Sequence, residues 1–361
     1  MEIVHIIKDE KFFYDYINFI NNNFSSDKHK FIYISNKEKA KYKIPKCDNI
    51  IDFGCSVETI SGLLLNWWRI KAIIYKADKV ILHGAACSNF NKFLFFNKSF
   101  LAKTYWVMWG GDLYQPIINP PKTIKQKIHS FFDNKVKGNV FGYVGFIYGD
   151  YLLAKDLYNT NGLFYECLAY PSNIVAETEN KNKNKNKNNF NILIGNSADP
   201  SNDHLFILEQ ISKIDNMNMS VICPLSYGDL DYAKGVESLG MDLFSSRFIS
   251  IKEFLSLDDY LELIDNIDVV VFNHKRQQGC GNTISLLAKG KKVYLNKTTT
   301  TYKFFKSLGV DIFDSEQIDS TFFLEFDGAK NREIILKYCS IKNLVSQWDN
   351  IFKMSDKYGI K

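Results

Sequence analysis

The stretch Asp268-Val-Val-Val-Phe-Asn-His-Lys-Arg-Gln-Gln-Gly-Cys-Gly-Asn-Thr283 decides the fold class. Its four consecutive apolar residues, 269–272, predict a buried strand, and two glycines then precede a helical pattern that begins at about Asn282. Strand, polar loop and helix form the repeating unit of α/β proteins with a parallel sheet. The loop therefore lies at the carboxyl end of a strand, where such proteins bind ligands.

The loop in this stretch has the chemistry of an anion site. The helix start presents free backbone amides and the positive end of the helix dipole, and Arg276 can clamp a diphosphate through two parallel hydrogen bonds. Such a site assists the departure of a nucleoside diphosphate. The expected ligand-binding residues are Arg276, Gln277, Gln278, Gly279, Gly281, Asn282 and Thr283. The alternative is a solvated basic turn that also contains Lys275.

A second stretch, Asn191-Ile-Leu-Ile-Gly-Asn-Ser-Ala-Asp-Pro-Ser-Asn-Asp-His204, repeats the pattern. We expect a strand that ends in a small-residue turn, followed by a helix that begins near Ser201 or Asn202. Glycine permits close backbone approach, and the polar side chains can contact phosphate or sugar oxygens. The expected donor-binding residues are Gly195, Asn196, Ser197, Asn202 and His204. The alternatives are an ordinary turn with Ser201 as N-cap and a purely structural His204.

A third loop follows the run that ends at Pro224 and offers Ser226 and Tyr227 to the same ligand, with a structural turn as the alternative. The acidic pair Asp229 and Asp231 resembles a metal-binding D-x-D motif, but its place after Gly228 is also typical of a helix N-terminus. We expect no metal and no cofactor. Gly279-Cys-Gly281 lacks the third glycine of a dinucleotide-binding fingerprint, which disfavours an oxidoreductase.

The rest of the chain continues the alternation of strands and helices. Further strands are expected at 31–35, 79–84, 104–109, 143–147, 220–224 and 292–296. A Lys/Asn-rich tract without apolar residues interrupts the pattern near the middle. We therefore expect an N-terminal Rossmann-like domain at 1–175, a linker at 176–189, a C-terminal Rossmann-like domain at 190–340 and a crossover helix at 341–361.

Composition limits the partners. The formal charge of +5 over 361 residues is spread along the chain, so nucleic acid is not implied, although anionic ligands are favoured. No run approaches the roughly 20 apolar residues that a membrane-spanning helix needs, and the first 20 residues have no signal-peptide pattern. The seven cysteines are scattered and are expected to be reduced cytosolic thiols.

Two N-terminal segments end in unusual polar residues. The strand at 79–84 ends in His83 and Gly84, and the strand at 104–109 runs into Trp109-Gly-Gly-Asp-Leu-Tyr114. Asp112 or His83 can accept a proton from an acceptor hydroxyl, and Trp109 can stack on a sugar ring. The expected acceptor-binding residues are Trp109, Gly110, Gly111 and Tyr114. Equally, Asp112 can cap a helix and His83 can be a packed strand-end residue.

This half is also rich in neighbouring aromatic and basic residues. They include Trp67, Trp68, Arg69, Lys71, Phe93, Phe95, Phe96, Lys98 and Lys103. Such a combination is compatible with contact to a bilayer surface, while core packing explains most aromatic residues in a fold with 29 phenylalanines.

Taken together, these segments resemble one family. They are similar to bacterial transferases that move 4-acetamido-4,6-dideoxygalactose from thymidine diphosphate to lipid II of enterobacterial common antigen. The similar blocks are 83–84, 109–114, 192–197 with 201–204, and 276–279, in that order. They span about residues 80 to 300, and four blocks in order are more specific than any single loop.

The resemblance implies a GT-B architecture, in which two Rossmann-like domains face a central cleft. It implies that the C-terminal domain holds a thymidine-diphosphate sugar and the N-terminal domain a polyprenyl-diphosphate-linked glycan. It also implies a peripheral enzyme at the cytoplasmic face of the bacterial inner membrane, active in surface polysaccharide synthesis. The expected reaction is transfer of a deoxy-amino, fucose-type sugar, and an inverting course requires a base such as Asp112 or His83. In a retaining course Asp112 would only position the acceptor.

Two other functions remain open on this fold. A sugar-nucleotide epimerase would use the same donor loops without a lipid acceptor. A noncatalytic carbohydrate-binding protein would retain its ligand without turnover.

Overall fold

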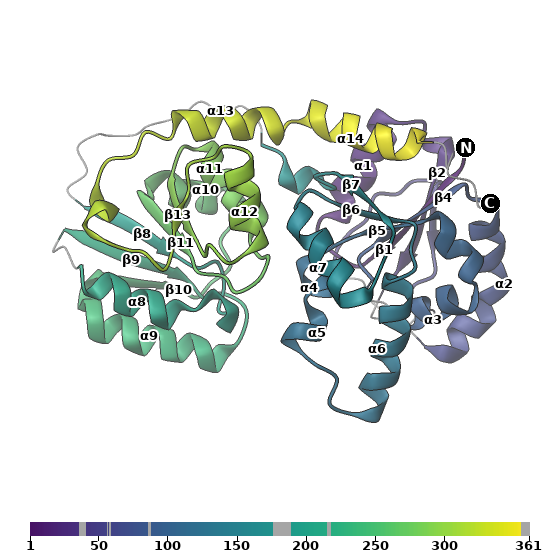
Figure 1. The fold of residues 1–361 in the computed structure, drawn as a ribbon, viewed down its shortest axis with the longest axis horizontal. Helices are drawn as coiled ribbons and strands as arrows, with labels where there is room; N and C mark the ends of the chain where they lie inside the picture. Colours follow the sequence, from purple (N-terminus) through teal and green to yellow (C-terminus); the bar gives the residue numbers. More distant parts are fainter. Residues whose placement is uncertain are drawn as a thin grey trace. The chain divides into compact units, whose positions relative to one another are not determined.

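The chain divides into two compact units in a computed structural model that describes residues 1–35, 41–55, 57, 59–85, 88–175, 189–214 and 218–354 (Figure 1). Unit 1 comprises Met1–Ile174 and Ile341–Lys361, and unit 2 comprises Val175–Ser340. The expected Lys/Asn-rich linker lies outside the described residues apart from Asn189. Because the chain leaves unit 1 and later returns to it, both ends of the sequence contribute to the same unit.

Unit 1 is built on a seven-stranded parallel sheet in the order β3-β2-β1-β4-β5-β6-β7. The strands are β1 Ile3–Lys8, β2 His29–Ile34, β3 Ile50–Asp52, β4 Lys79–His83, β5 Thr104–Val107, β6 Gly142–Gly145 and β7 Leu163–Glu166. The sequence predicted β2, β4, β5 and β6. It missed β3 and β7, which are short and incompletely buried strands at the two edges. It also missed β1, although this strand is central and fully buried, because His5 and Lys8 interrupt its apolar pattern.

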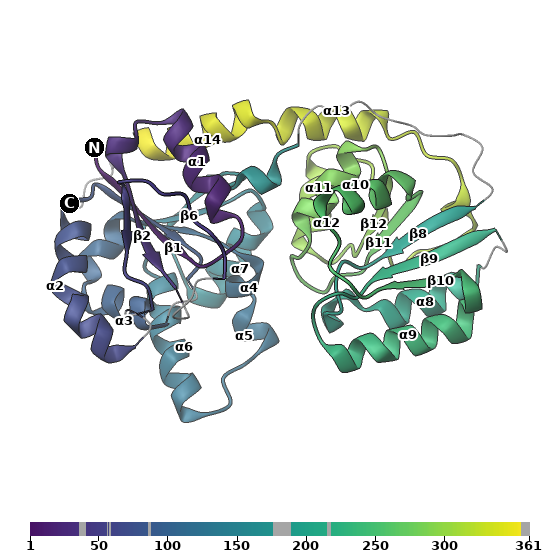
Figure 2. The same ribbon diagram turned by 180° about the vertical axis from the view of Figure 1, so that it is seen from behind.

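Helices cover both faces of this sheet. They are α1 Phe13–Asn23, α2 Ile60–Lys76, α3 Ser88–Phe96, α4 Gly110–Leu113, α5 Gln115–Ile118, α6 Ile124–Lys137, α7 Tyr148–Tyr158 and α14 Ile341–Lys353. One core joins α2, α3, α6 and α7 to a single face of the sheet, whereas α1 and α14 pack on the other (Figure 1 and Figure 2). This arrangement follows from right-handed crossovers, because the helices change face where the strand order reverses.

A histidine chain lies on the α1 side of the sheet. His83 Nε2 is 3.3 Å from His5 Nδ1, and His5 Nε2 is 3.0 Å from His29 Nδ1. The hydroxyl of Tyr170 meets His83 Nδ1 at 2.8 Å. If this hydroxyl donates to His83, each neutral ring donates through Nε2 to the next one. Burial lowers the pKa of His83 to about 3 and that of His29 to about 4, which keeps these rings neutral.

The C-terminal helix α14 closes the same side of unit 1. Leu344, Trp348, Ile351 and Phe352 are buried, which matches the helical spacing seen in the sequence. Trp348 donates from Nε1 to the carbonyl of Ala169 at 2.9 Å. Its anchoring contacts in unit 1 therefore combine an apolar stripe with a hydrogen bond to the main chain.

Unit 2 is built on a six-stranded parallel sheet in the order β10-β9-β8-β11-β12-β13. The strands are β8 Phe190–Ile194, β9 Met219–Pro224, β10 Phe248–Ile251, β11 Val269–Phe272, β12 Lys292–Leu295 and β13 Phe313–Asp314. The sequence predicted β8, β9, β11 and β12. It missed β10 and β13, which are short edge strands with less regular burial.

The helices of unit 2 are α8 His204–Ser212, α9 Leu230–Phe244, α10 Leu257–Asn266, α11 Cys280–Ala288, α12 Thr300–Ser307 and α13 Ala329–Tyr338. A core of apolar residues joins α8 and α9 to one face of the sheet, and α11 packs against α13 (Figure 1). Both units thus have the layered, doubly wound α/β architecture that the strand and helix alternation predicted.

The histidine chain makes a prediction about acid stability. The pKa of His83 is lower in the folded protein than its ordinary value of 6.5, so the unfolded chain binds protons more readily and stability falls as the pH drops below 6.5. Between pH 7 and pH 5 we expect His83 alone to cost about 2 kcal/mol in the free energy of unfolding.

The measurement is denaturant unfolding of wild type and of His83→Gln at both pH values. Glutamine does not titrate, so the variant should lose less stability on acidification than wild type, whatever its absolute stability. Equal losses in both proteins would contradict a neutral buried His83.

Candidate functional site

Each sheet has one switch point, where the strand order reverses and neighbouring loops diverge toward opposite faces. In parallel sheets ligands bind at the carboxyl edge beside this point. In unit 2 the order reverses between β8 and β11, and in unit 1 between β1 and β4. The loops after β8 and β11 are the two stretches that the sequence predicted to bind the donor, so the fold of unit 2 brings them together.

The loop after β8 requires a glycine at its first position. Gly195 has a φ of 66°, and a Cβ there would lie 2.2 Å from Nε2 of His204. The next residue, Asn196, donates from its backbone nitrogen to Oδ1 of Asn202 at 3.0 Å. The loop therefore folds closely around the side chain of Asn202.

Asn202 is fully buried and joins the two loops. Its Oδ1 also meets Nε2 of His274, in the loop after β11, at 2.9 Å, and its Nδ2 donates to the carbonyl of Asp199 at 2.9 Å. Nδ2 also reaches Oγ of Ser197 at 3.3 Å. Burial lowers the pKa of His274 to about 3, so this ring is neutral. Asn202 thus has a positioning role rather than the direct ligand contact that was predicted.

Arg276 is held at the same edge by an ion pair. Its NH2 lies 2.9 Å from Oδ2 of Asp199, and only 18% of its side chain is exposed. Burial opposes ionisation of Asp199, but hydrogen bonds from Ser201 and Arg276 outweigh it and lower the pKa of this carboxyl. The guanidinium is therefore oriented by a stable negative partner before any ligand arrives.

The two glutamines of the β11 loop behave differently. Gln278 donates from Nε2 to Oδ1 of Asn196 at 3.2 Å and accepts from the hydroxyl of Ser201 at 2.7 Å. Gln277 instead points its amide to Sγ of Cys280 at 3.2 Å. Of these two glutamines, Gln278 joins the β11 loop to the β8 loop.

Helix α11 begins at Cys280, two residues before the predicted start, because Gly279 is its N-cap with a φ of 62°. A Cβ at Gly279 would lie 3.1 Å from Nδ2 of Asn196, so this glycine also permits close approach of the two loops. Gly281 and Asn282 lie in the first turn, where backbone amides lack partners within the helix. Thr283 departs from its predicted ligand role, since it is buried and its hydroxyl donates to the carbonyl of Gly279 at 3.1 Å.

The third loop lies beside the first. Ala198 donates from its backbone nitrogen to the carbonyl of Tyr227 at 2.7 Å and forms an isolated parallel bridge with Gly228. The side chain of Tyr227 is 49% exposed, and Ser226 is half-buried. This pairing brings Ser226 and Tyr227 to the same edge as the β8 loop, as predicted from sequence.

Asp229 has a structural function. Its Oδ1 accepts from the backbone nitrogens of Asp231 and Tyr232, both at 2.9 Å, and so caps α9. This is the helix N-terminus alternative to a metal-binding D-x-D motif. Within the described ranges, His, Cys, Asp and Glu side chains form no group of three that is placed to hold a metal.

The helix after the β8 loop begins later than predicted. Pro200–Asn202 form a short 3-10 helix, Asp203 adopts a left-handed φ of 55°, and α8 starts only at His204. The helix does not start at Ser201 or Asn202 because the side chain of Asn202 points inward and forms hydrogen bonds with the loop. His204 itself is fully buried beside Tyr232, and burial lowers its pKa to about 4. This burial and the contact with Tyr232 fit the alternative of a structural His204, and its donor-binding role stays a prediction.

In unit 1 the structure differs from the prediction that His83 meets an acceptor. Its side chain is fully buried, and its two ring nitrogens face Tyr170 and His5. Access to an acceptor hydroxyl would require breaking this chain. The alternative, a packed strand-end residue, describes the geometry better.

Asp112 is also enclosed. It is 4% exposed, and three donors reach its carboxylate: the backbone nitrogen of Ala85 at 2.5 Å, Nε1 of Trp106 at 2.8 Å and the backbone nitrogen of Trp109 at 2.8 Å. Burial raises its pKa, although Lys137 and these hydrogen bonds counteract the effect. The carboxylate ties the loop after β4 to the start of α4, which differs from its predicted role as an accessible base.

The predicted acceptor residues occupy different environments. Trp109 is half-buried, lies against Gly84 and donates from Nε1 to Tyr170 at 2.9 Å. Gly111 is exposed and Gly110 partly so. Tyr114 is buried and donates to Oδ1 of Asp150 at 3.0 Å, so its hydroxyl is turned into unit 1.

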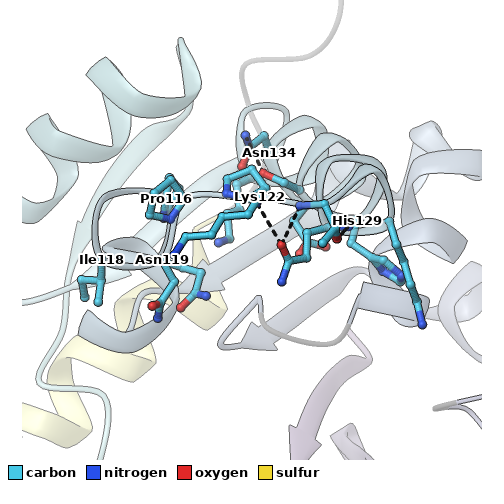
Figure 3. Close-up of a pocket in the computed structure, with 15 residues that line it drawn as sticks. Pro116, Ile118, Asn119, Lys122, His129 and Asn134 are labelled. Carbon is cyan, nitrogen blue, oxygen red and sulfur yellow. Dashed lines mark hydrogen bonds between the residues drawn. The ribbon is translucent and has the colours of Figure 1, made fainter.

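The structure shows an open region that the sequence did not predict, the α5–α6 hollow. It has a volume of about 880 Å³ and lies between α5, the 119–123 loop and α6 (Figure 3). Its lining residues are Gln115, Pro116, Ile118, Asn119, Pro120, Pro121, Lys122, Thr123, Lys125, Gln126, His129, Ser130, Asp133, Asn134 and Lys137. Most of these side chains are polar, and three are lysines.

Asp133 is the carboxyl group of the α5–α6 hollow. Its Oδ1 accepts from Nδ2 of Asn91 at 2.9 Å, and Asn91 in turn donates to the carbonyl of Ala85 after β4. Burial raises the pKa of Asp133, while Lys137, His129 and Lys8 counteract this. Asn91 thus connects Asp133 to the loop after β4, one of the two switch-point strands of unit 1. The residue was missed because it sits within a helix, far in sequence from either switch-point strand.

Comparison with known proteins agrees with this fold. A lipopolysaccharide outer core galactosyltransferase superposes with a TM-score of 0.65 at 10% identity, over 98% of this chain and 99% of that one. Sucrose-phosphate synthase from Thermosynechococcus elongatus gives 0.65 at 9% identity, over 98% of each chain. HepE from Anabaena, in complex with UDP and glucose, gives 0.66 at 12% identity, over 98% of this chain and 99% of that one.

These similarities place the two parallel α/β units in the GT-B fold class of glycosyltransferases. The sequence of residues 5–327 matches a family described as 4-alpha-L-fucosyltransferase, glycosyl transferase group 56. The match covers most of the chain and agrees with the resemblance inferred from the four sequence blocks. The chain is therefore a glycosyltransferase that belongs to the 4-alpha-L-fucosyltransferase family, group 56.

Proposed function

We propose that this enzyme transfers 4-acetamido-4,6-dideoxygalactose, or a related fucose-type sugar, from a thymidine-diphosphate donor to a polyprenyl-diphosphate-linked oligosaccharide. The reaction belongs to bacterial surface polysaccharide synthesis, with the enzyme peripheral to the cytoplasmic face of the inner membrane. The observation that carries the proposal is the polar network of unit 2, which joins the β8 loop, Arg276 and the N-terminus of α11 at one switch point.

The donor diphosphate binds at the start of α11. Backbone amides of Gly281 and Asn282 point from the first turn, and the helix dipole favours negative charge there. Arg276, oriented by Asp199, supplies the positive charge that compensates the departing diphosphate. The exposed ring of Tyr227 and the hydroxyl of Ser226 border the same edge and contact the base or the sugar.

The acceptor binds to unit 1 at the α5–α6 hollow. Its volume of about 880 Å³ accommodates a sugar with part of a diphosphate. Lys122 and Lys125 are exposed on its wall and provide positive charge for the acceptor diphosphate. Trp109 and the exposed Gly111, near the carboxyl end of β5, contact the acceptor glycan.

Asp133 accepts the proton of the acceptor hydroxyl. The oxygen of that hydroxyl forms a bond to the anomeric carbon, the bond from this carbon to the donor diphosphate breaks, and the nucleoside diphosphate leaves with the electron pair. The raised pKa of Asp133 brings this carboxylate closer to the basicity that proton transfer needs. Asp112 acts by position, since it fixes the loops after β4 and β5 that border this region. His83 is held between Tyr170 and His5 and supports the end of β4.

The test is turnover by the purified protein with thymidine- and uridine-diphosphate sugars, with and without a polyprenyl-diphosphate-linked acceptor. We expect nucleoside diphosphate release that depends on acceptor, together with a glycolipid heavier by one sugar. Donor conversion without acceptor would instead indicate a sugar-nucleotide epimerase. Tight donor binding without turnover across the panel would indicate a noncatalytic carbohydrate-binding protein.

Replacing Arg276 tests the donor site. Arg276→Gln removes the charge that stabilises the departing diphosphate, so we expect kcat/KM to fall about 100-fold or more and nucleoside diphosphate affinity to weaken. Arg276→Lys should recover only part of the loss, because an ammonium group cannot make the paired hydrogen bonds of a guanidinium.

Steady-state kinetics and calorimetric binding of thymidine diphosphate measure both effects. Lys234→Gln is the control, since Lys234 is a 76% exposed cation of unit 2 on α9. Equal behaviour of the Arg276 and Lys234 variants would place the diphosphate elsewhere.

Replacing Asp133 tests the acceptor site. Asp133→Asn keeps an oxygen for the hydrogen bond from Asn91 but cannot accept a proton, so we expect kcat to fall about 100- to 10,000-fold. Donor affinity should not change. In wild type, kcat/KM should decrease as the pH falls toward the raised pKa of Asp133, because the protonated carboxyl cannot act as a base.

The residual activity of Asp133→Asn should lose this acidic limb of the pH profile. Asp156→Asn, at an exposed position on α7, is the matched control and should resemble wild type. A wild-type kcat and pH profile in Asp133→Asn would return the role of base to Asp112 or His83.

A further inference from the structure

Helix α2 presents an apolar stripe to solvent. Leu64, Leu65, Trp68 and Tyr75 are exposed by 61%, 86%, 74% and 76%, and they recur at the spacing of one helix face. An outer helix of an α/β unit normally shows polar residues on that face. The sequence of α2 contains no acidic residue, and its charged residues are Arg69, Lys71 and Lys76.

The stripe continues on neighbouring helices. Phe96 at the end of α3 is 65% exposed, and Ile124, Ile128 and Phe131 on α6 are exposed by 79%, 50% and 50%. Helix α3 packs against both α2 and α6, and the three helices cover the same face of the sheet (Figure 1). The exposed apolar residues of these three helices are called the α2–α3–α6 face below.

This face is surrounded by positive charge. The segments 60–76, 88–103 and 124–137 contain one acidic residue, Asp133. Lys137 is buried, and the other basic residues of these segments are Arg69, Lys71, Lys76, Lys92, Lys98, Lys103, Lys125, Lys127 and Lys135. Several ammonium groups lie over aromatic rings: Lys71 is 5.0 Å from the ring centroid of Trp68, and Lys98 is 5.3 Å from that of Phe95. Lysines whose stems flank apolar side chains are typical of surfaces that meet lipid headgroups.

We propose that the α2–α3–α6 face docks on a bilayer that contains anionic lipids. Leucine, isoleucine, phenylalanine and tryptophan side chains enter the interface, and the surrounding lysines and arginines attract acidic headgroups. A protein partner with an ordinary mixed surface would be complemented by charges of both signs. The charged side chains of these three helices are basic, apart from Asp133, which lines the hollow on the other side of α6. Within the described residues, no helix is long and apolar enough to span a bilayer.

The α2–α3–α6 face and the α5–α6 hollow share helix α6 and lie on opposite sides of it. On α6, Gln126, His129 and Asp133 line the hollow, while Ile124 and Ile128 lie on the other side of the helix. The proposal rests on the proposed function in one respect, that the acceptor is lipid-linked. Docking then holds the α5–α6 hollow across α6 from the bilayer surface, near the diphosphate of a membrane-bound acceptor.

The test uses the full chain and sedimentation with vesicles. Wild type should bind vesicles of phosphatidylglycerol and phosphatidylcholine more tightly than pure phosphatidylcholine vesicles, and the difference should shrink with added salt. The double variant Leu65→Glu with Trp68→Glu should lose binding by about tenfold or more, because two apolar side chains are replaced by charges that acidic lipids repel. Both side chains are highly exposed, so the fold is retained.

Leu324→Glu is the matched control, since Leu324 in unit 2 is 62% exposed beside the acidic residues Glu325 and Asp327. It should bind vesicles as wild type does. The proposal would be overturned if the wild type did not bind acidic vesicles, or if the double variant bound them as tightly as the wild type does. So would a wild-type dimer in light scattering that the double variant abolishes, because the face would then bind a second copy.

Turnover separates this proposal from the proposed function. With a lipid-linked acceptor in vesicles, the double variant should be at least tenfold slower than wild type, whereas with a water-soluble short-chain acceptor the two should be equal. A deficit of the same size with both acceptors would contradict a docking role. If wild type turned over neither acceptor, the proposed function would fail, and vesicle binding would still decide the docking face.

Discussion

Parallel strand pairing is the constraint on which both functional regions depend. It places every strand-to-helix loop of a sheet at one edge, and the reversal of strand order then opens space between two of those loops. In unit 2 that space is bordered by Gly195 and Gly279, whose positive φ angles allow the loops to approach each other. Asn202 joins polar atoms of both loops by hydrogen bonds, so the two loops are held together before a ligand binds.

The same constraint has a different result in unit 1. Beside its switch point, His83 and Tyr170 join the aromatic packing under α1 and α14, and Asp112 binds the loops to each other. Burial of these polar groups makes this edge rigid, but it also withdraws them from solvent. Less buried charge is found at the α5–α6 hollow, where Asp133 is half-buried and Lys122 and Lys125 are exposed. The buried polar groups that hold this edge together are thus different residues from those that line the hollow.

Much of this architecture was predictable from periodicity, and the exceptions have physical causes. The buried runs at β8, β9, β11 and β12 are continuous in the sequence, whereas β1 was missed because His5 breaks its run; the buried histidine chain satisfies that polar ring. Composition could not reveal that the side-chain oxygens of Asp112 and Thr283 form hydrogen bonds with backbone groups. Asp133 could not be found by pattern, since its place beside Asn91 depends on packing of α6 against α3.

Helix α6 has a polar side that lines the α5–α6 hollow and an apolar side that is exposed at the surface. A helix that is polar on one side and apolar on the other usually buries the apolar side in a core. In α6 the residues at 126, 129 and 133 face the hollow, while Ile124, Ile128 and Phe131 are left at the surface. Exposing them to water is unfavourable, so a contiguous group of such side chains is typical of a surface that a partner or a membrane covers. In the docking proposal an anionic bilayer covers them, and a lipid-linked acceptor would reach the carboxylate of Asp133 from across the same helix.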